Sequence, residues 1–309
     1  MKKILVPTDF SDQSKNAALY AIELARQFHA SITLFHVFTL APATVYPPLY
    51  SPGHPGSAVI QDEVLKAEQQ NKQRLEAFRD LLIKGQKEPC CHIAQRGGFV
   101  SESIQEFAQQ KDFDLIVMST HGSSSVSDLF IATNTWEVIR SGETAVMVIP
   151  ETMPYTKLDH VAFATDFSDT DLESLNNIID IAGKFDARIS VVHVKPRDDD
   201  ASHDQMLRQF EKKVRSIHPH ADLHFTLSES ENIQKGLDDF ITQKNVNALA
   251  MVSRKYNIIK SLFHRKLTKQ YAYHSNIPLF VFPQHKKEDP NRNRPPLWMS
   301  TRKGTKIVH

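Results

Sequence analysis

Cysteine is almost missing from this 309-residue chain. Its two cysteines, Cys90 and Cys91, are adjacent, so they cannot link distant segments and do not have the spacing of a zinc site. An excess of charge of one sign is also missing. The formal net charge is +1, so no global field attracts nucleic acid or an anionic membrane. No apolar run approaches the roughly 18 residues that span a membrane. We therefore expect no nucleic-acid partner and no membrane partner.

The N-terminal apolar run is short as well. It is interrupted by Pro7 and Asp9, which is too early for a secretory signal peptide. Together with the cysteine usage, this predicts a cytoplasmic location. The composition, 40% hydrophobic and 24% charged, is that of a globular protein, and the length fits two domains of roughly 150 residues.

What the chain does contain is an internal repeat. ILVPTDFSDQSKNAALYAIELARQFHASITLFHV begins at Ile4, and VAFATDFSDTDLESLNNIIDIAGKFDARISVVHV begins at Val161. In each copy a short β-rich run ends in Thr-Asp-Phe-Ser-Asp, and an amphipathic stretch follows. The helix that this stretch predicts can be capped by the serine or by the second aspartate of that motif. Later segments also match, including TAVMVIP with IPLFVFP.

Each copy reads β-α-β-α-β-α-β-α-β. Helices between nearly continuous apolar strands indicate an α/β fold, here two tandem five-stranded, mostly parallel sheets with helices on both faces. The predicted domains are residues 1–150 and 158–283, followed by a basic tail at residues 284–309. Residues 40–57 are rich in proline, which predicts an extended excursion in the first domain. In the two predicted helices after the motif, the shared apolar faces are Ala18, Ile22 and Ala25, and Leu175, Ile179 and Ala182.

Four stretches of the first copy, KILVPTDFSDQSKNAALYAIELA, LFHV, DLIVMSTHG and TAVMVIP, together resemble the universal stress protein family. The order of the two copies resembles its tandem-domain members. The resemblance implies a Rossmann-like sheet of the adenine nucleotide alpha-hydrolase type and a role in the stress response. Some members of the family bind ATP at the carboxyl ends of the strands, and others bind no nucleotide.

ATP-binding members carry glycine, two residues, glycine, nine residues, then glycine and a hydroxyl residue. At these positions this chain has Ser119, Gly122, Ala132 and Thr133. On the adenosine side, an aspartate follows the first strand and an apolar residue ends the second. The resemblance thus implies these cofactor-binding residues: Pro7, Thr8, Asp9, Val37, Met118, Ser119, His121, Gly122, Ala132, Thr133, Asn134 and Thr135.

Two interpretations of the loop at residues 119–133 stay open. Backbone N–H groups and a helix dipole can hold a phosphate, and glycine is needed where φ is positive or where a Cβ would crowd the anion. If Ser119 and Ala132 have ordinary φ values, the loop can still bind ATP, with or without Mg²⁺. Otherwise it is a serine-rich turn without a ligand, and the protein is a stress-associated interaction module.

Nothing in the sequence marks a catalyst. It has no nucleophile elbow, no metal-ligand cluster and no Walker-type loop, so no catalytic residue and no metal ligand is assigned. A single carboxylate, Asp9, supports slow ATP hydrolysis at most. His36 and His193, at equivalent strand ends, are interpreted as structural.

The second copy lacks the glycine loop. Its corresponding positions carry Arg254, Lys255, Arg265 and Lys266, which form either a solvated surface or a basic patch. The short apolar strands at residues 144–150 and 277–283 would expose sheet edges. We expect them to pair, which makes the chain an intrachain pseudo-dimer and leaves room for a homodimer of whole chains.

Overall fold

A computed structural model describes residues 1–38, 55–84, 89–119, 131–150, 153–197, 202–253 and 277–284. The chain divides into two compact units between Thr144 and Ala145. The elements of unit 1 are β1 (Lys3–Pro7), α1 (Asp12–Phe28), β2 (Ser31–Phe38), α2 (Pro55–Ile83), β3 (Cys91–Gly97), α3 (Val100–Gln110), β4 (Leu115–Ser119) and α4 (Ile131–Ser141). Those of unit 2 are β5 (Ala145–Ile149), β6 (His160–Ala164), α5 (Asp169–Phe185), β7 (Arg188–Lys195), α6 (Ser202–Ile217), β8 (Leu223–Glu229), α7 (Ile233–Lys244), β9 (Ala248–Val252) and β10 (Leu279–Phe282).

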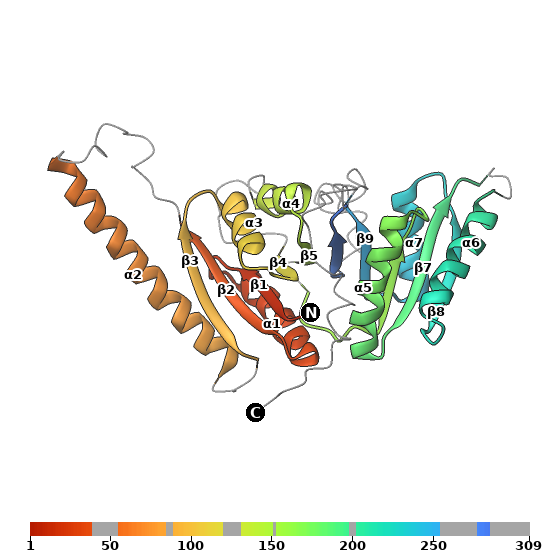
Figure 1. Ribbon diagram of the computed structural model, residues 1–309, viewed down its shortest axis with the longest axis horizontal. Coiled ribbons are helices and arrows are strands. Elements are labelled where there is room, and N and C mark those ends of the chain that lie inside the picture. Colours follow the sequence, from red (N-terminus) through yellow and green to blue (C-terminus); the bar gives the residue numbers. More distant parts are fainter. Residues whose placement is uncertain are drawn as a thin grey trace, which may run out of the picture. The chain divides into compact units, whose positions relative to one another are not determined.

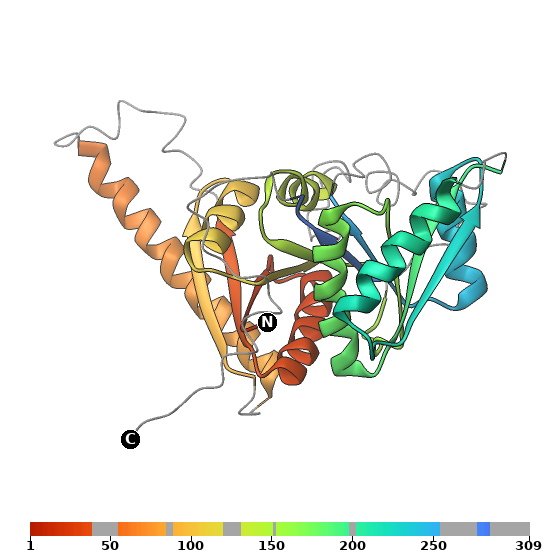
Figure 2. The same cartoon turned by 45° about the vertical axis from the view of Figure 1, so that its right-hand side comes forward.

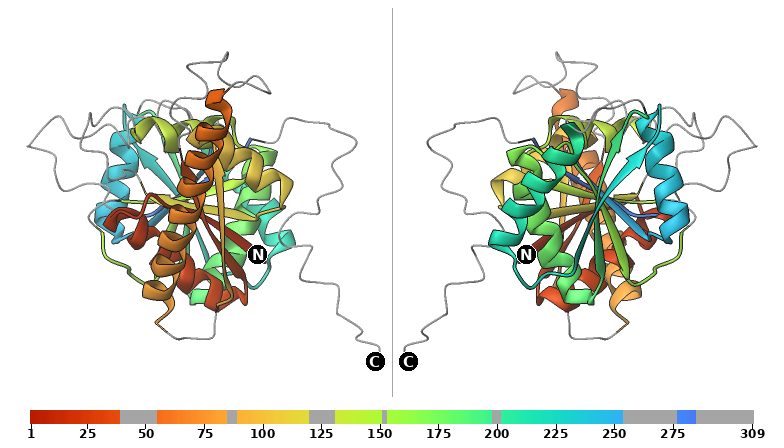
Figure 3. Two further views of the ribbon diagram at one scale, coloured as in Figure 1. Left: turned by 90° about the vertical axis from the view of Figure 1, so that its left-hand side faces the viewer. Right: turned by 90° about the vertical axis from the view of Figure 1, so that its right-hand side faces the viewer.

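The sheet of unit 1 has the order β3-β2-β1-β4 and is parallel. Because crossovers are right-handed, a helix lies on one face of the sheet when the chain moves toward one edge, and on the other face when the chain moves toward the opposite edge. Accordingly α1 contacts α2, and α3 contacts α4. Figure 3 (left) shows α2 and α3 on opposite sides of β3. The sheet is therefore covered on both faces, as its apolar strands predict.

Unit 2 repeats this order as β8-β7-β6-β9 and continues to β10 and β5. Its strands are parallel except for β5, which pairs antiparallel with β10. In that ladder Val148 lies opposite Leu279, and Met147 lies opposite Phe280. Helices α5 and α6 lie over one face and α7 lies over the other (Figures 2 and 3). The predicted α/β class with mostly parallel strands is thus confirmed.

The helix faces that pack on the sheets follow the predicted periodicity with one exception. On α1 the three predicted residues, Ala18, Ile22 and Ala25, are all buried. On α5, Leu175 and Ala182 are buried, Ile178 and Ile181 beside them are buried as well, and Ile179 is only half-buried. Ile179 thus lies at the margin of the predicted face, because spacings of three and four are both compatible with a helix of 3.6 residues per turn.

Helix α2 begins earlier than the proline pattern indicates. Pro55 and Gly56, which the sequence assigned to the extended excursion, belong to the helix. Pro55 can start the helix because the N–H groups of the first turn have no intrahelical acceptor, so the missing N–H of proline removes no hydrogen bond there. The first copy of the repeat is longer than the second. Helix α2 has 29 residues and its counterpart α6 has 16, so α2 accounts for part of this extra length. Figure 1 shows it running along β3 and past its end.

The rest of the excursion, at residues 39–54, lies outside the described residues, as does the tail from residue 285 onward. In the part of the chain that the structure describes, no helix combines the length and the apolar character that a membrane crossing requires.

Candidate functional site

The predicted adenosine-side residues meet at the carboxyl edge of the unit 1 sheet. Pro7 ends β1, Val37 is the next-to-last residue of β2, and Ser119 ends β4. Because β1 pairs in parallel with both neighbours, these three ends share one edge. The strand order reverses on either side of β1, and ligands of open α/β sheets bind at such switch points. Met118 is buried beside this edge, with 7% of its surface exposed.

Thr8 is built into the turn that follows β1. Its N–H donates to Phe35 O (2.9 Å), and its side-chain oxygen accepts from the N–H of Phe10 (3.0 Å). The hydroxyl of Ser14 donates to Ser11 O (2.9 Å), which leaves the Thr8 hydroxyl as the donor in the 2.9 Å contact between Thr8 and Ser14. Both hydroxyls are buried, so the role of Thr8 in this structure is to hold the turn.

Asp9 is oriented by the serine two residues later. Its Oδ1 accepts from the N–H of Ser11 (3.1 Å) and from the Ser11 hydroxyl (2.5 Å). Ser11 is also the N-cap of α1, since its side chain accepts from the N–H of Ser14. Of the two predicted caps, Ser11 and Asp12, the structure selects Ser11. The Asp9 carboxylate is therefore fixed at the strand end before any ligand arrives.

An aromatic cluster supports this turn from the α2 side. Phe10 has a left-handed backbone (φ 69°), which is strained for a residue with a Cβ. Its ring lies 4.5 Å from His36 and 5.8 Å from Phe78, and the guanidinium of Arg74 lies 4.2 Å above it. These contacts offset the strain and hold the chain direction that places Asp9 at the edge.

His36 links the ends of β1 and β2. Its Nδ1 donates to the carbonyl of Thr8 (2.8 Å). Burial lowers the pKa of His36, and Arg74 lowers it further, while the bond to Thr8 and the charge of Asp9 act in the opposite direction. The neutral imidazole with a bonded Nδ1 fits the structural role predicted for it.

The phosphate side of the predicted site is described only in part. His121 and Gly122 lie outside the described residues, as do the side chains of Ala132 and Thr133. The two outer glycine positions belong to regular elements, since Ser119 lies in β4 and Ala132 in α4. Strands and α-helices have negative φ, so replacing glycine at these two positions adds a Cβ without left-handed strain.

Helix α4 is joined near its beginning to the end of β4. The Thr135 hydroxyl is buried and donates to Ser119 O (3.0 Å), while the neighbouring Asn134 is half-buried. This bond places the N-terminal end of an 11-residue helix next to the carboxyl edge of the sheet. The positive end of that helix dipole is where an anion is favoured.

The equivalent turn of unit 2 has the same path and a different interior. Phe167 repeats the positive φ of 67°, and the Nδ1 of His193 donates to Thr165 O (2.8 Å). Here, however, Asp171 replaces the serine of unit 1. Its Oδ2 accepts from the Thr165 hydroxyl (3.0 Å) and from the N–H groups of Asp166 (2.7 Å) and Ser168 (3.3 Å).

Asp171 is fully buried and forms a capping box with Ser168, the N-cap of α5. Of the two predicted caps of this helix, Ser168 and Asp169, the structure selects Ser168. The donors of this turn are thus directed at a carboxylate of the same chain. The four basic residues at the loop positions of this copy, Arg254, Lys255, Arg265 and Lys266, lie outside the described residues.

Sequence reasoning missed three residues that shape these turns. Arg74 gave no signal, because its contact with Phe10 depends on how α2 lies over the sheet. Ser14 and Asp171 occupy the same position of the repeat, so their difference was visible in the sequence, but its meaning depends on the hydrogen bonds of the turn.

Comparison with known proteins identifies relatives of both the sequence and the fold. The family model described as "Universal stress protein family" matches residues 1–150. A universal stress protein of Methanocaldococcus jannaschii is 32% identical over 149 residues, which is 48% of this chain and 81% of that protein.

The fold likeness extends further than the sequence match. A universal stress protein of Archaeoglobus fulgidus aligns with 93% of this chain and 97% of its own, with a TM-score of 0.61 and 18% identity. A Pseudomonas aeruginosa protein of unknown function aligns over 92% of both chains, with a TM-score of 0.57 and 13% identity. At these identities the two structures establish the fold alone.

Proposed function

The chain belongs to the universal stress protein family, and from this premise we propose that its first unit binds ATP and that the protein acts in the regulation of the stress response. The observation that supports the proposal most is the backbone at the two substituted glycine positions. Ser119 lies in a strand and Ala132 in a helix, so the loop between them is anchored on regular elements at both ends.

The residues at the carboxyl edge suit the parts of the nucleotide. Asp9, held by Ser11, offers a carboxylate oxygen as an acceptor for hydroxyl or amino hydrogens of adenosine. Val37 offers an apolar surface for the base. The N-terminal end of α4, tied down by Thr135, favours the phosphates.

Mg²⁺ would enter with the nucleotide, since it prefers phosphate oxygens and water. Among the described residues no group of three or more His, Cys, Asp or Glu side chains is placed to hold a metal ion. The proposal assigns no catalytic residue, and the proposed role is binding.

Unit 2 has a supporting role in this proposal. In its turn after β6 the Thr165 hydroxyl and the N–H groups of Asp166 and Ser168 already donate to the buried Asp171 carboxylate, so they are not available to a ligand. We further propose that the two predicted domains, residues 1–150 and 158–283, form a pseudo-dimer through the strands at residues 144–150 and 277–283. The antiparallel pairing of β5 with β10 supports it.

The test is nucleotide binding by the full chain. Nucleotide extracted from purified protein is identified by mass spectrometry, and Mg-ATP is titrated while the melting temperature is followed. We expect a saturable upward shift that Gly122→Leu abolishes. A matched control is Gly183→Ala in α5, where an added Cβ meets no atom within 4 Å.

A second variant tests the adenosine side. Asp9→Asn keeps an oxygen that can accept from Ser11 and removes the charge, so the turn should survive while affinity falls about tenfold. If Mg-ATP produces no shift in the wild-type chain, the nucleotide proposal is wrong and the alternative, an interaction protein without a nucleotide, takes its place. A shift that persists in Gly122→Leu would mean that the loop is not the phosphate site.

A further inference from the structure

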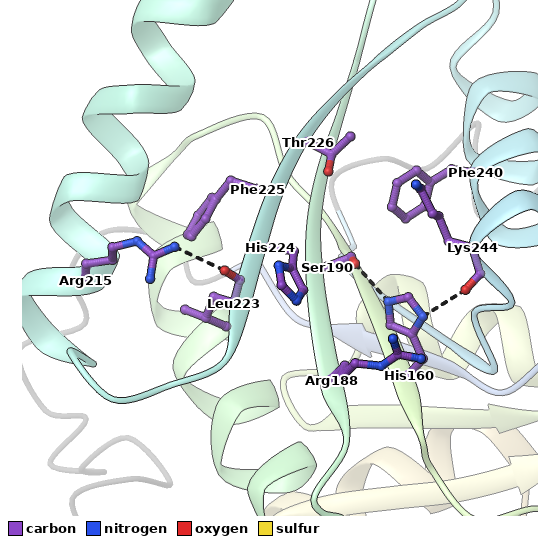
Figure 4. Close-up of a pocket in the computed structure, with 10 residues that line it drawn as sticks. All are labelled: His160, Arg188, Ser190, Arg215, Leu223, His224, Phe225, Thr226, Phe240 and Lys244. Carbon is purple, nitrogen blue, oxygen red and sulfur yellow. Dashed lines mark hydrogen bonds between the residues drawn. The ribbon is translucent and has the colours of Figure 1, made fainter.

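Unit 2 contains a cavity of about 440 Å³ at the amino ends of β6, β7 and β8 (Figure 4). This edge is opposite to the carboxyl edge at which the turn of Asp171 lies. The volume is within the range of small-molecule sites. The cavity is lined by His160, Arg188, Ser190, Arg215, Leu223, His224, Phe225, Thr226, Phe240 and Lys244.

The lining is strongly basic. It contains two arginines, one lysine and two histidines, and none of these ten described residues is acidic. Arg215 is already engaged, because it donates to Glu211 Oε1 (2.7 Å) and to Leu223 O (3.1 Å). Within the described ranges, Arg188 and Lys244 form no ion pair. Two cations from different elements, β7 and α7, therefore lack a counter-charge at this cavity.

His160 holds the cavity wall and contributes no charge at neutral pH. It is buried, its Nδ1 donates to Lys244 O (3.0 Å), and its Nε2 accepts from the Ser190 hydroxyl (2.8 Å) (Figure 4). Burial lowers the pKa of His160, and the nearby charges of Arg188 and Lys244 act in the same direction. The imidazole thus ties the end of α7 to β6 and β7.

The C-terminal end of α7 would by itself disfavour an anion. Three of its last four carbonyls are, however, already bonded. Lys244 O accepts from His160, and the N–H of Asn245 donates to the carbonyls of Ile241 and Thr242. An acid beside the lining, Asp222, has its Oδ1 3.5 Å from Nε2 of His224. One carboxylate thus faces one histidine, and the two unpaired cations remain.

The other walls offer one hydrogen-bond donor and one apolar surface. The Thr226 hydroxyl has no hydrogen bond to another described residue, so its hydrogen is available. Phe240 is 5% exposed and forms an apolar wall from α7. A phosphate group has several oxygens that accept from cations and hydroxyls, but alone it would fill only a fraction of this volume.

From these features we propose that the cavity binds a small phosphomonoester, whose phosphate contacts Arg188, Lys244 and Thr226 and whose organic part lies against Phe240. The site is separate from the proposed ATP site in chain position and in chemistry, and it does not depend on that proposal. It gives the chain a means of sensing a phosphorylated metabolite through unit 2.

Isothermal titration calorimetry on the full chain tests the site with ribose 5-phosphate, with ribose and inorganic phosphate as the two component probes. We expect ribose 5-phosphate to bind with a dissociation constant below about 1 mM, more tightly than phosphate, and ribose to give no signal. Arg188→Ala and Lys244→Ala should each weaken binding about tenfold or more. Lys235→Ala, an exposed lysine at the other end of α7, is the matched control and should bind as the wild type does.

The proposal is overturned if ribose 5-phosphate gives no saturable heat, or if both cavity variants bind it as well as Lys235→Ala does. Should a cavity variant fail to fold, NMR on the wild-type chain decides instead: the imidazole signals of His160 and His224 must shift on titration. The measurement is repeated with saturating Mg-ATP. Unchanged affinity supports a separate site, and competition between the two ligands would refute it.

Discussion

Removing the carboxylate of Asp171 should lower the unfolding free energy of unit 2 far more than the small size of this side chain indicates. In Asp171→Ala three donors lose their acceptor: the buried Thr165 hydroxyl at 3.0 Å, the Asp166 N–H at 2.7 Å and the Ser168 N–H at 3.3 Å. A buried donor left without a partner costs about 1–3 kcal/mol. The two N–H groups are only partly buried, so water can replace much of their loss. The capping box is lost as well, at about 1 kcal/mol. We expect a total of about 2–4 kcal/mol.

Two companion variants separate the contributions. Asp171→Asn keeps the shape and one acceptor oxygen, so it should lose about half as much. Ser14→Ala, the same position in unit 1, removes a contact between two neutral hydroxyls and should cost about 1 kcal/mol. The ranking of the three variants is a stronger prediction than any single value.

The assay combines urea unfolding with hydrogen–deuterium exchange. Unfolding gives the free-energy change, and exchange locates it, because a chain of two units need not unfold in one step. Peptides covering residues 160–175 should exchange faster in Asp171→Ala, while those of unit 1 stay unchanged. A loss below about 0.5 kcal/mol, with unaltered exchange in that peptide, would refute the idea that the carboxylate holds the turn together.

Three further outcomes follow from the contacts of the described residues. Burial lowers the pKa of His160 in the folded state below 6.5, the ordinary value for histidine, so the stabilising effect of its neutral form is present above pH 6.5 and is lost as the pH falls; His160→Gln should flatten the fall in unfolding free energy between pH 7.5 and pH 5, and an unchanged slope would contradict this. Phe10 has positive φ, so Phe10→Gly should be as stable as Phe10→Ala or more stable by up to about 1 kcal/mol in thermal melts, the reverse of the usual order. Burial raises the pKa of Cys91 to about 11, so at pH 8 iodoacetamide should modify the exposed Cys90 first, as mass spectrometry would show; equal rates would argue against a protected thiol.

Much of the fold was accessible from the sequence, because the physical signal is strong. Parallel strands covered on both faces must be apolar along their whole length, and the runs at β1, β4, β6 and β9 are buried as expected. The two serine caps were predicted as alternatives, and local hydrogen bonds decided between them. The carboxyl-edge residues were predicted only through the family resemblance.

The remainder depends on contacts between segments that lie far apart in sequence. The cation above the ring of Phe10 is Arg74 of α2, and this contact depends on how α2 lies over the sheet. The cavity of unit 2 collects residues from three strands and two helices. None of them belongs to a motif, because a cavity arises from where the elements end and not from local spacing.

The two units follow one turn path and differ in what the turn encloses. Phe10 and Phe167 share the same left-handed conformation, and a histidine fastens each turn to the next strand. In unit 2 the acceptor for the turn donors is Asp171, which is attached to the chain and therefore present at a high effective concentration. A ligand oxygen cannot compete with it without unfolding the first turn of α5. In unit 1 Ser14 brings no charge, and the N–H and hydroxyl of Ser11 donate to the carboxylate of Asp9, whose counterpart in unit 2 is Asp166. The residue at this one position of the repeat thus decides which carboxylate accepts from the turn, Asp171 in unit 2 and Asp9 in unit 1.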